Sequence, residues 1–526
     1  MSKFEGNFAG KNIIPYRSRG GKQYSPNDIE QFLRRFKLCT ALRLIGKLSG
    51  RILTSRKGTL FIRNFPVSNG ILAYLSMKLI ENSNDYRSQD MTIDDLLKAI
   101  DMFFGLPDPF ESDKENPQGC LIRFGSSQLD YDREVHHILP RTIIIYRDLW
   151  DTVVNSNKVN IANAIQEISG LNLKEIFVLS FAFTEKSKKG FFHLYEHEGY
   201  FEPLKKYFSP DKQQAFADWI SCSYSEFRRL SRSDNLPTID YDKFRFNPLH
   251  LKPAIIPDRN LRPGYSQVYI TPIPSLVYER VTRGLYFNLA DHFRKENHNP
   301  FRAAFGSVFQ EYVGLLLKNT FGESNVKREW EYGSKNNSKA TPDWFVIQNN
   351  IAVLIEVKQS GLYLESKKWG EVEKIQEDLL KSIGAGVEQM WKFENDIAND
   401  LYTFPSWFNG IQITERLVVT YDRSYFLNSL LKDEIRQLYP HVEENYHWHT
   451  IAIEELEYFL GIVGTNFIEA LAEKRLDVEG VEMDFRDYYA RKYSADDIKN
   501  PYLSHVYDEF FGELGFPPTE VEEEQL

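Results

Sequence analysis

The feature that most constrains the fold of this chain of 526 residues is a pair of β-prone segments on either side of Asn349 and Asn350. Asparagine tolerates the positive φ angles that a two-residue turn between antiparallel strands requires, so the two segments predict a tight β-hairpin. With these two residues as the turn, the register places Asp343 directly opposite Glu356, with Cβ atoms roughly 5 Å apart. A single hairpin is therefore expected to bring two carboxylates together.

Lys358 completes this group, because side chains of a strand alternate between its two faces. Glu356 and Lys358 share one face, whereas Ile355 and Val357 point to the other. Two acids and one amine on a sheet that is otherwise apolar would be costly to bury without compensation. A cation between the carboxylates supplies it, and hard oxygen ligands suit Mg²⁺ or Mn²⁺, which take substrate phosphate oxygens as further ligands.

Such a cation lowers the pKa of a bound water and neutralises charge that develops on a phosphate. A lysine beside it can orient or deprotonate the attacking water, or act as a fixed positive charge in the transition state. The residues alone do not distinguish these roles of Lys358. The competing interpretation makes Asp343 and Glu356 exposed charges of an edge strand, with Lys358 as their salt-bridge partner.

The segments around the hairpin predict an α/β fold with a central mixed sheet flanked by helices. The expected order is helix, three strands, helix, strand, helix, strand and helix. The corresponding residues are 301–320, then 326–332, 341–348 and 351–358, then 365–397 with an interruption expected at Gly384–Gly386, then 414–421, 425–438, 448–453 and 454–463.

Pro342-Asp343 and Glu356-Val357-Lys358 resemble the motif of the PD-(D/E)xK nuclease superfamily, which includes many restriction endonucleases and recombination nucleases. The resemblance implies a restriction-endonuclease-like core of helix, three antiparallel strands, helix and strand. That is the order expected from the residues themselves.

The resemblance covers about residues 300–425 and implies two further site residues. Family members often carry a glutamate on the first helix that completes the metal shell, and Glu311 stands in the matching segment. Some members carry Gln-x-x-x-Tyr on the second helix. Gln389 occupies the glutamine position, but Phe393 stands where the family has tyrosine, which weakens the assignment of Gln389.

The resemblance implies a metal-dependent nuclease that hydrolyses phosphodiester bonds, with DNA favoured over RNA as the partner. Glu311, Asp343, Glu356 and the Val357 carbonyl would hold Mg²⁺ or Mn²⁺, and Lys358 would act on the attacking water. A long module fused to such a core is similar to the layout of prokaryotic anti-phage and restriction effectors. Defence against phage or foreign DNA is therefore expected only by analogy.

Two alternatives remain open. One is an RNA nuclease or a transposition-associated endonuclease, and the other is a catalytically silent nucleic-acid-binding or assembly protein that keeps the fold. Two further patterns are disfavoured. His193-Leu194-Tyr195-Glu196-His197 fits an H-x-x-E-H zinc site only on a stable helix with a third ligand. The segment around His136 and His137 resembles the first strand of an HNH nuclease without its paired cysteines.

Outside the core, residues 1–295 predict a large, mainly α-helical module for recognition or assembly, through which the chain would form a homo-oligomer or bind a partner protein. Residues 300–465 form the expected nuclease domain, and 466–526 an extension with an acidic tail. The polar run around 296–300 marks the boundary.

Charge and cysteine content complete these expectations. Residues 1–70 hold fourteen Lys or Arg and three Asp or Glu, a net charge of +11, whereas residues 481–526 have a net charge of −8. A basic end on an acidic protein favours a polyanionic partner. Three scattered cysteines and no long apolar stretch favour a cytoplasmic protein with no membrane contact. Six basic residues either contact phosphates or are simply solvated: Arg228, Arg229, Arg232, Lys252, Arg259 and Arg262.

Overall fold

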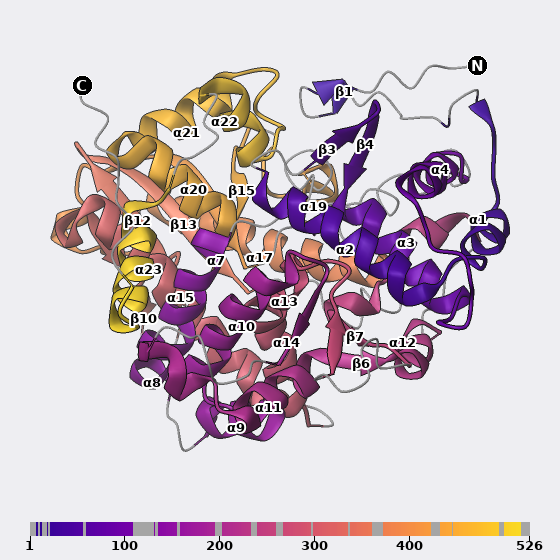
Figure 1. The fold of residues 1–526 in the computed structure, drawn as a ribbon. Helices are drawn as coiled ribbons and strands as arrows, with labels where there is room; N and C mark the ends of the chain where they lie inside the picture. The colour runs from indigo at the N-terminus through magenta and orange to yellow at the C-terminus, as the bar shows by residue number, and fades with distance from the viewer. Residues whose placement is uncertain are drawn as a thin grey trace, which may run out of the picture.

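The computed structural model shows a mixed α/β protein that is mostly helical and contains several small sheets (Figure 1). No helix among the described residues is both long and apolar enough to span a bilayer. Cys39 and Cys222 are buried thiols, and Cys120 lies outside the described residues. The structure describes residues 7–8, 11–12, 18, 21–55, 59–108, 131, 135–154, 158–194, 202–232, 239–258, 267–295, 298–334, 337–359, 372–421, 432–443, 445–493 and 499–516.

The largest sheet has five strands in the order β15-β14-β13-β12-β9. β12 is antiparallel to both of its neighbours, whereas β14 is parallel to both β13 and β15. A separate antiparallel pair, β10 and β11, is inserted between β9 and β12. The strands are β9 (Val326–Arg328), β10 (Glu331–Ser334), β11 (Asn337–Ala340), β12 (Trp344–Gln348), β13 (Ile351–Lys358), β14 (Gln412–Thr420) and β15 (His449–Ala452).

The β12–β13 hairpin has the predicted register. Asn349 and Asn350 form the turn with φ angles of 51° and 64°. Trp344 lies opposite Ile355. Asp343, the residue just before β12, therefore stands at the position that faces Glu356, as the turn residues indicate.

Helices cover the two faces of this sheet, and the alternation along β13 shows which side chains meet them. Val353 and Ile355 join the core that contains helix α15 (Pro300–Phe321). Leu354 joins the core that contains helix α17 (Val372–Ala398). By the same period of two, Glu356 and Lys358 face α17.

Helix α17 runs without the interruption that Gly384–Gly386 predicted. The prediction was wrong because both glycines serve close packing instead of a break. A Cβ atom at Gly384 would lie 2.5 Å from the ring of Tyr439, and one at Gly386 would lie 3.0 Å from Cγ of Glu356. The missing side chain of Gly386 therefore lets the helix approach the sheet, and that of Gly384 makes room for the ring of Tyr439.

The N-terminal half contains a four-stranded sheet, β5-β8-β7-β6, besides its helices. Two of these strands, β7 and β8, lie in residues 231–275, a segment rich in Pro, Asn, Asp and Arg. The strands outside the five-stranded sheet are β1 (Asn7–Phe8), β2 (Lys11–Asn12), β3 (Thr59–Ile62), β4 (Phe65–Ser68), β5 (Phe191–His193), β6 (Ser221–Ser223), β7 (Ala254–Ile256) and β8 (Val268–Ile270).

The remaining α-helices fall on both sides of the central sheet in the sequence. Those before it are α1 (Pro26–Leu33), α2 (Leu38–Thr54), α3 (Asn69–Asn82), α4 (Ile93–Phe104), α7 (Val135–Ile143), α8 (Trp150–Val153), α9 (Ile161–Ser169), α10 (Leu173–Ser187), α11 (Pro210–Ile220), α12 (Tyr224–Ser231), α13 (Ser275–Val281) and α14 (Arg283–His292). Those after α17 are α19 (Lys432–Leu438), α20 (Ile453–Val463), α21 (Phe467–Leu476), α22 (Phe485–Tyr493) and α23 (Pro501–Glu513).

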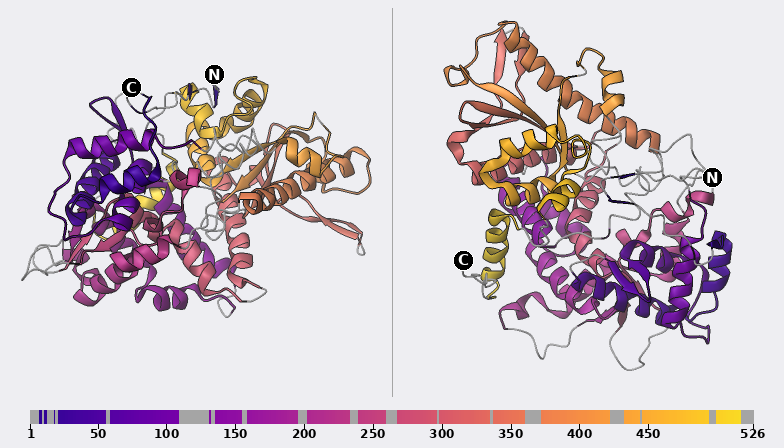
Figure 2. Two further views of the ribbon diagram at one scale, coloured as in Figure 1. Left: turned by 90° about the vertical axis from the view of Figure 1, so that its right-hand side faces the viewer. Right: turned by 90° about the horizontal axis from the view of Figure 1, so that it is seen from above.

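The N-terminal helices and the large sheet occupy different parts of the molecule, whereas the middle of the chain shares a core with its C-terminal part. In both views of Figure 2, the indigo N-terminal helices and the orange strands of the large sheet lie on opposite sides. One apolar core nevertheless extends from Leu139 to Leu514 and includes residues on both sides of the predicted boundary near 296–300. The division into 1–295, 300–465 and 466–526 stays a prediction.

A buried ion pair connects the halves. Arg141 of α7 donates to both carboxylate oxygens of Glu457 of α20, at 2.6 and 2.7 Å. Tyr312 of α15 donates to the same carboxylate at 2.6 Å. Three helices distant in sequence therefore meet at one carboxylate.

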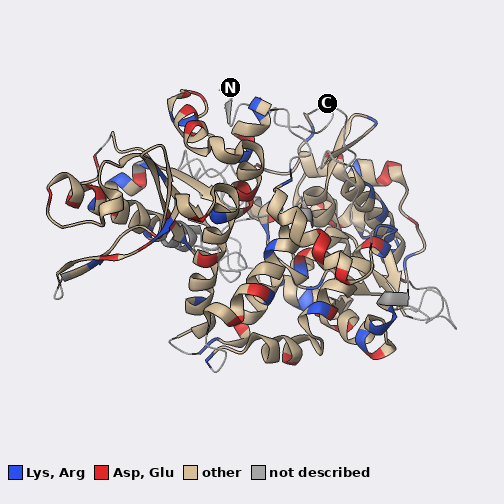
Figure 3. Ribbon diagram, turned by 90° about the vertical axis from the view of Figure 1, so that its left-hand side faces the viewer, with Lys and Arg blue, Asp and Glu red and all other residues tan. Residues whose placement is uncertain are grey.

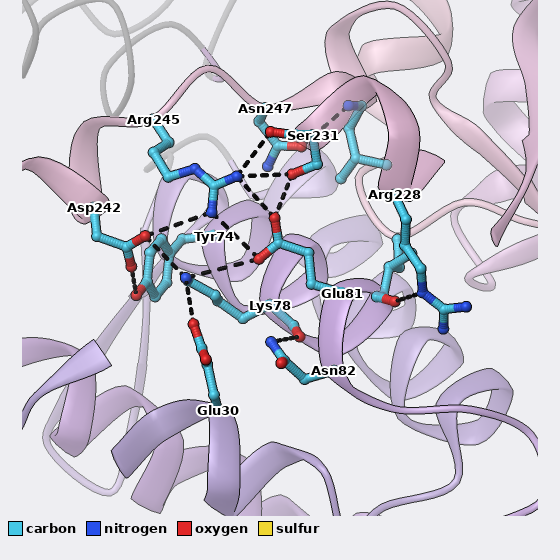
Figure 4. Close-up of polar contacts among 12 residues, drawn as sticks. Glu30, Tyr74, Lys78, Glu81, Asn82, Arg228, Ser231, Asp242, Arg245 and Asn247 are labelled. Carbon is cyan, nitrogen blue, oxygen red and sulfur yellow. Dashed lines mark hydrogen bonds and ion pairs between the residues drawn. The ribbon is translucent and has the colours of Figure 1, made fainter. Parts of the chain in front are cut away.

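A second buried network lies between α1, α3 and the segment 239–245 (Figure 4). Lys78, with 2% of its side chain exposed, donates to Asp242 at 2.8 Å and to Glu30 at 2.9 Å. Arg245 pairs with Glu81 at 2.9 Å. Tyr74 donates to the second oxygen of Asp242. We call this the Lys78 network; its members are Glu30, Tyr74, Lys78, Glu81, Asp242 and Arg245.

Candidate functional site

Asp343 lies where three elements meet. Its Oδ2 accepts a hydrogen bond from the main-chain N–H of Val357 on β13 at 2.6 Å. Its Oδ1 accepts one from Nε2 of Gln310 on α15 at 2.8 Å. The carboxylate is therefore held at both oxygens, by the neighbouring strand and by a helix on the other side of the sheet.

Glu356 and Lys358 are in direct contact on the face of β13 that α17 covers. Nζ of Lys358 donates to Oε1 of Glu356 at 2.5 Å. Only 1% of Glu356 is exposed, and its Oε2 is buried with no hydrogen-bond partner among the described residues. Lys358 keeps 22% of its side chain accessible. The structure thus brings Asp343, Glu356 and Lys358 together, and leaves one buried carboxylate oxygen unpaired.

The surroundings disfavour the charged form of both acids. Burial raises the pKa of Glu356 and the nearby charge of Asp343 raises it further, whereas Lys358 and the main-chain N–H of Asp343 oppose the shift. Burial also raises the pKa of Asp343, while the Val357 N–H and Lys358 lower it and Glu329 raises it. A single lysine therefore does not compensate two buried carboxylates, and further positive charge at this position would stabilise their ionised forms.

Helix α17 covers the site on the face of the sheet that carries Glu356 and Lys358. A Cβ atom on Gly386 would lie 3.0 Å from Cγ of Glu356 and 3.1 Å from Cε of Lys358. Its backbone therefore packs directly against both side chains. Gln389, three residues further along α17, donates to the carbonyl oxygen of Thr341 at 3.0 Å. This hydrogen bond holds the main chain just before Asp343, so Gln389 affects the site through the main chain.

Glu311 and Gln310 have different surroundings, although they are neighbours on α15. The carboxylate of Glu311 pairs with Arg328 at 2.6 Å. Gln310 instead donates to both Asp343 and Glu329, each at 2.8 Å. Gln310 and Glu329 therefore belong to the site, and the sequence reasoning missed both. The assignment of Glu311 as a metal ligand stays a prediction; in this structure its Oε1 pairs with Arg328.

The donor set fits a divalent cation with oxygen ligands. Within the described parts of the chain, no three His, Cys, Asp or Glu side chains are grouped closely enough to hold a metal ion by themselves. Asp343 and Glu356 would therefore share the cation with main-chain oxygen, water or substrate, which is how Mg²⁺ is usually bound. The unpaired Oε2 of Glu356 is the observation that favours such a cation.

Among the described residues, the other sequence motifs form no comparable site. His193 lies in strand β5, whereas the zinc pattern needs a helix, and Glu196 and His197 lie outside the described residues. His137 lies in helix α7, whereas the HNH pattern needs a strand. Over the described residues seen in Figure 3, basic and acidic residues are interspersed.

Two of the six candidate phosphate-binding residues are engaged within the protein. Arg228 donates to the carbonyl oxygens of Ile80 and Ser83, both at 2.7 Å. Lys252 donates to the carbonyl oxygen of Trp219 at 2.9 Å. Arg259 and Arg262 lie outside the described residues. The acidic tail beyond residue 516 lies outside them as well.

Comparison of the chain with protein-family models, with curated protein sequences and with solved structures finds no match. The interpretation of the site therefore rests on its residues and their geometry.

Proposed function

We propose that this protein is a metal-dependent nuclease that hydrolyses phosphodiester bonds, with DNA as the favoured substrate. The observation that carries the proposal is the buried pair of Asp343 and Glu356 beside Lys358, with Oε2 of Glu356 unpaired. The order of α15, β9, β12, β13, α17 and β14 supports a restriction-endonuclease-like core. The chemistry of the site and the order of the elements thus favour the same class of enzyme.

Asp343, Glu356 and the carbonyl oxygen of Val357 would hold Mg²⁺ or Mn²⁺. When bound, the cation supplies positive charge to the phosphate and lowers the pKa of a water molecule. Oxygen ligands are the ones that these cations prefer. The two acids would then be ionised together, and the repulsion that raises their pKa values would be offset.

The chain's own residues prepare the site in distinct ways. Lys358 places an accessible ammonium next to Glu356, where it can orient the attacking water or hold a positive charge near the reacting phosphate. The Val357 N–H fixes the direction of the Asp343 carboxylate. Gly386 lets α17 exclude water from Glu356. A buried, prearranged set of charges of this kind is what makes electrostatic catalysis effective.

The test is a cleavage assay with supercoiled plasmid DNA and with RNA, in Mg²⁺ or EDTA. Lys358→Ala is expected to lower the cleavage rate about 10²- to 10⁴-fold, the usual contribution of a positioned proton-transfer group. Lys392→Ala is the matched control, because Lys392 lies on α17 with 54% of its side chain exposed. Cleavage that survives both EDTA and Lys358→Ala would overturn the proposed site, and binding of DNA without cleavage would favour the silent nucleic-acid-binding protein.

Defence against phage or foreign DNA is a further part of the proposal, supported only by the layout of a long module before the core. Cells that produce the wild-type protein should resist phage infection, and cells that produce Lys358→Ala should not. Equal protection by the two proteins would contradict a defence role that depends on the nuclease site.

A further inference from the structure

We infer that Gln310 and Glu329, rather than Glu311, hold Asp343 in the position that binds the cation. The inference rests on the proposed function and assigns positioning roles to two residues that the motif does not contain. It follows from how α15, the end of β9 and the start of β12 come together.

Gln310 bridges two carboxylates with one nitrogen. Its Nε2 lies 2.8 Å from Oδ1 of Asp343 and 2.8 Å from Oε1 of Glu329. A primary amide has two N–H groups, so each carboxylate receives one. The opposite orientation of the amide would direct its oxygen at two carboxylates and is electrostatically unfavourable. Glu329 therefore fixes the direction in which Gln310 donates to Asp343.

The main chain around this bridge is fixed as well. The indole Nε1 of Trp344 donates to the carbonyl oxygen of Gln310 at 3.0 Å. The ring can lie this close to α15 because Gly314 has no side chain; a Cβ atom there would be 2.1 Å from the ring. In addition, the N–H of Glu329 donates to the carbonyl oxygen of Asp343 at 2.8 Å. Both positioning residues are thus tied to the Asp343 segment through main chain and side chain.

The bridge leaves room for a cation on Asp343. One oxygen accepts from Gln310 and the other from Val357, and each carboxylate oxygen has a second lone pair. Asp343 can therefore keep both hydrogen bonds while it binds a cation. Partners of this kind set the orientation of metal ligands, and their loss typically weakens metal affinity about 10- to 100-fold.

Glu311 is the natural comparison, because it is the next residue of the same helix. Its carboxylate pairs with Arg328, whose side chain is 56% exposed. An ion pair with an exposed partner contributes little to stability, so replacing Glu311 should disturb the fold little. Glu311→Ala is therefore a matched control for Gln310→Ala.

The experiment measures Mn²⁺ binding to the full-length protein by isothermal titration calorimetry, with thermal unfolding of the metal-free proteins as the check on folding. Gln310→Ala and Glu329→Ala are expected to weaken Mn²⁺ binding about 10- to 100-fold. Glu311→Ala should bind as the wild type does. Glu329→Gln should retain most of the affinity, since its amide oxygen still accepts from Gln310. This conservative rescue separates a positioning role from a direct ligand role of Glu329.

Three outcomes are decisive. Wild-type affinity in Gln310→Ala and Glu329→Ala, with weak binding in Glu311→Ala, would overturn the inference in favour of Glu311. Equal loss in Glu329→Ala and Glu329→Gln would overturn the positioning role of Glu329, because its charge and not its acceptor oxygen would matter. Wild-type affinity in Asp343→Asn would instead overturn the metal site of the proposed function, whatever the other variants do.

Discussion

The Lys78 network and the candidate site are both clusters of buried ionisable groups. Their surroundings have opposite effects on the charged forms of these groups. In the Lys78 network, the carboxylates of Asp242 and Glu81 outweigh burial and raise the pKa of Lys78, which stabilises its charged form (Figure 4). In the candidate site, burial raises the pKa of both Asp343 and Glu356, which destabilises their charged forms.

The two clusters differ in whether their charges are paired. The Lys78 network pairs its own charges, whereas the candidate site needs a further positive group. Each ionised member of the Lys78 network has a partner within the network, from α1, α3 or the segment 239–245. In the site, Oε1 of Glu356 accepts a hydrogen bond from Lys358, whereas Oε2 has no hydrogen-bond partner among the described residues. We therefore expect substitutions to destabilise the first cluster and to change ligand binding at the second.

The largest effect is expected for Lys78→Met. Removing the ammonium leaves Asp242 and Glu30 without their main cation, and breaking a buried pair in this way usually costs about 3–5 kcal/mol of unfolding free energy. The measurement is the midpoint of urea denaturation. Arg63→Met is the control, because Arg63 and Asp94 are both about two-thirds exposed and such a pair contributes about 0–1 kcal/mol. Similar losses in the two variants would show that the Lys78 network is no more important than a surface ion pair.

A smaller effect is expected for Gly386→Ala. The new Cβ atom would crowd Glu356 and Lys358, and such overpacking costs about 1–3 kcal/mol. Gly512→Ala in helix α23 has nothing within 4 Å of its new Cβ atom and should instead gain up to about 1 kcal/mol from helix propensity. The unfolding free energies of the two variants and their Mn²⁺ affinities test this. Unchanged Mn²⁺ affinity in Gly386→Ala would argue against α17 as the cover of the site.

Lys474 of α21 is a second buried lysine, and its pKa shifts in the opposite direction to that of Lys78. Burial, together with Lys432, lowers its pKa from 10.5 to about 7. Its Nζ donates to the carbonyl oxygens of Gly480 and Val481. Above about pH 7 the folded protein has released this proton and the unfolded chain still holds it. The unfolding free energy should therefore rise with pH from about 7 towards 10.5, by at most about 1.4 kcal/mol per pH unit.

Lys474→Met should remove this part of the pH dependence. Thermal unfolding of the two proteins from pH 6.5 to 9 measures it, with the difference between them as the quantity of interest. A constant difference across this range would show that Lys474 does not titrate in the folded protein there.

Glu356→Gln is expected to cause no loss of stability in the absence of metal. The substitution replaces a buried acid whose ionisation the surroundings disfavour, so the unfolding free energy should rise, and the gain should increase with pH as the wild-type carboxylate ionises. Mn²⁺ should stabilise the wild type against heat and leave the variant unchanged. A large loss of stability in Glu356→Gln would place the site in the same class as the Lys78 network.

The hairpin was predictable because its information is local. Asn349 and Asn350 determine the turn, the turn determines the register, and the register determines that Asp343 faces Glu356. The period of two along β13 then places Lys358 beside Glu356. None of these steps needs knowledge of a residue more than about fifteen positions away.

The contacts that sequence reasoning missed depend on how distant elements pack. The choice between Gln310 and Glu311 depends on how α15 is rotated against the sheet, and neighbouring residues of a helix point about 100° apart. Gly384–Gly386 predicts a helix break in isolation, but Tyr439 and Glu356 fill the space that the glycines leave. Strands β7 and β8 have only three residues each, too few for an alternating pattern to appear.

The pairing of Arg141 with Glu457 has a consequence for the biosynthesis of the protein. The two residues are 316 positions apart, so the guanidinium of α7 leaves the ribosome long before its carboxylate partner is made. At ordinary rates of translation the delay is roughly 15–60 s. During this interval Arg141 and the apolar side chains around it have no native partner from α20, so the nascent chain exposes groups that the folded protein buries. The core from Leu139 to Leu514 can close only after Leu514 has been synthesised.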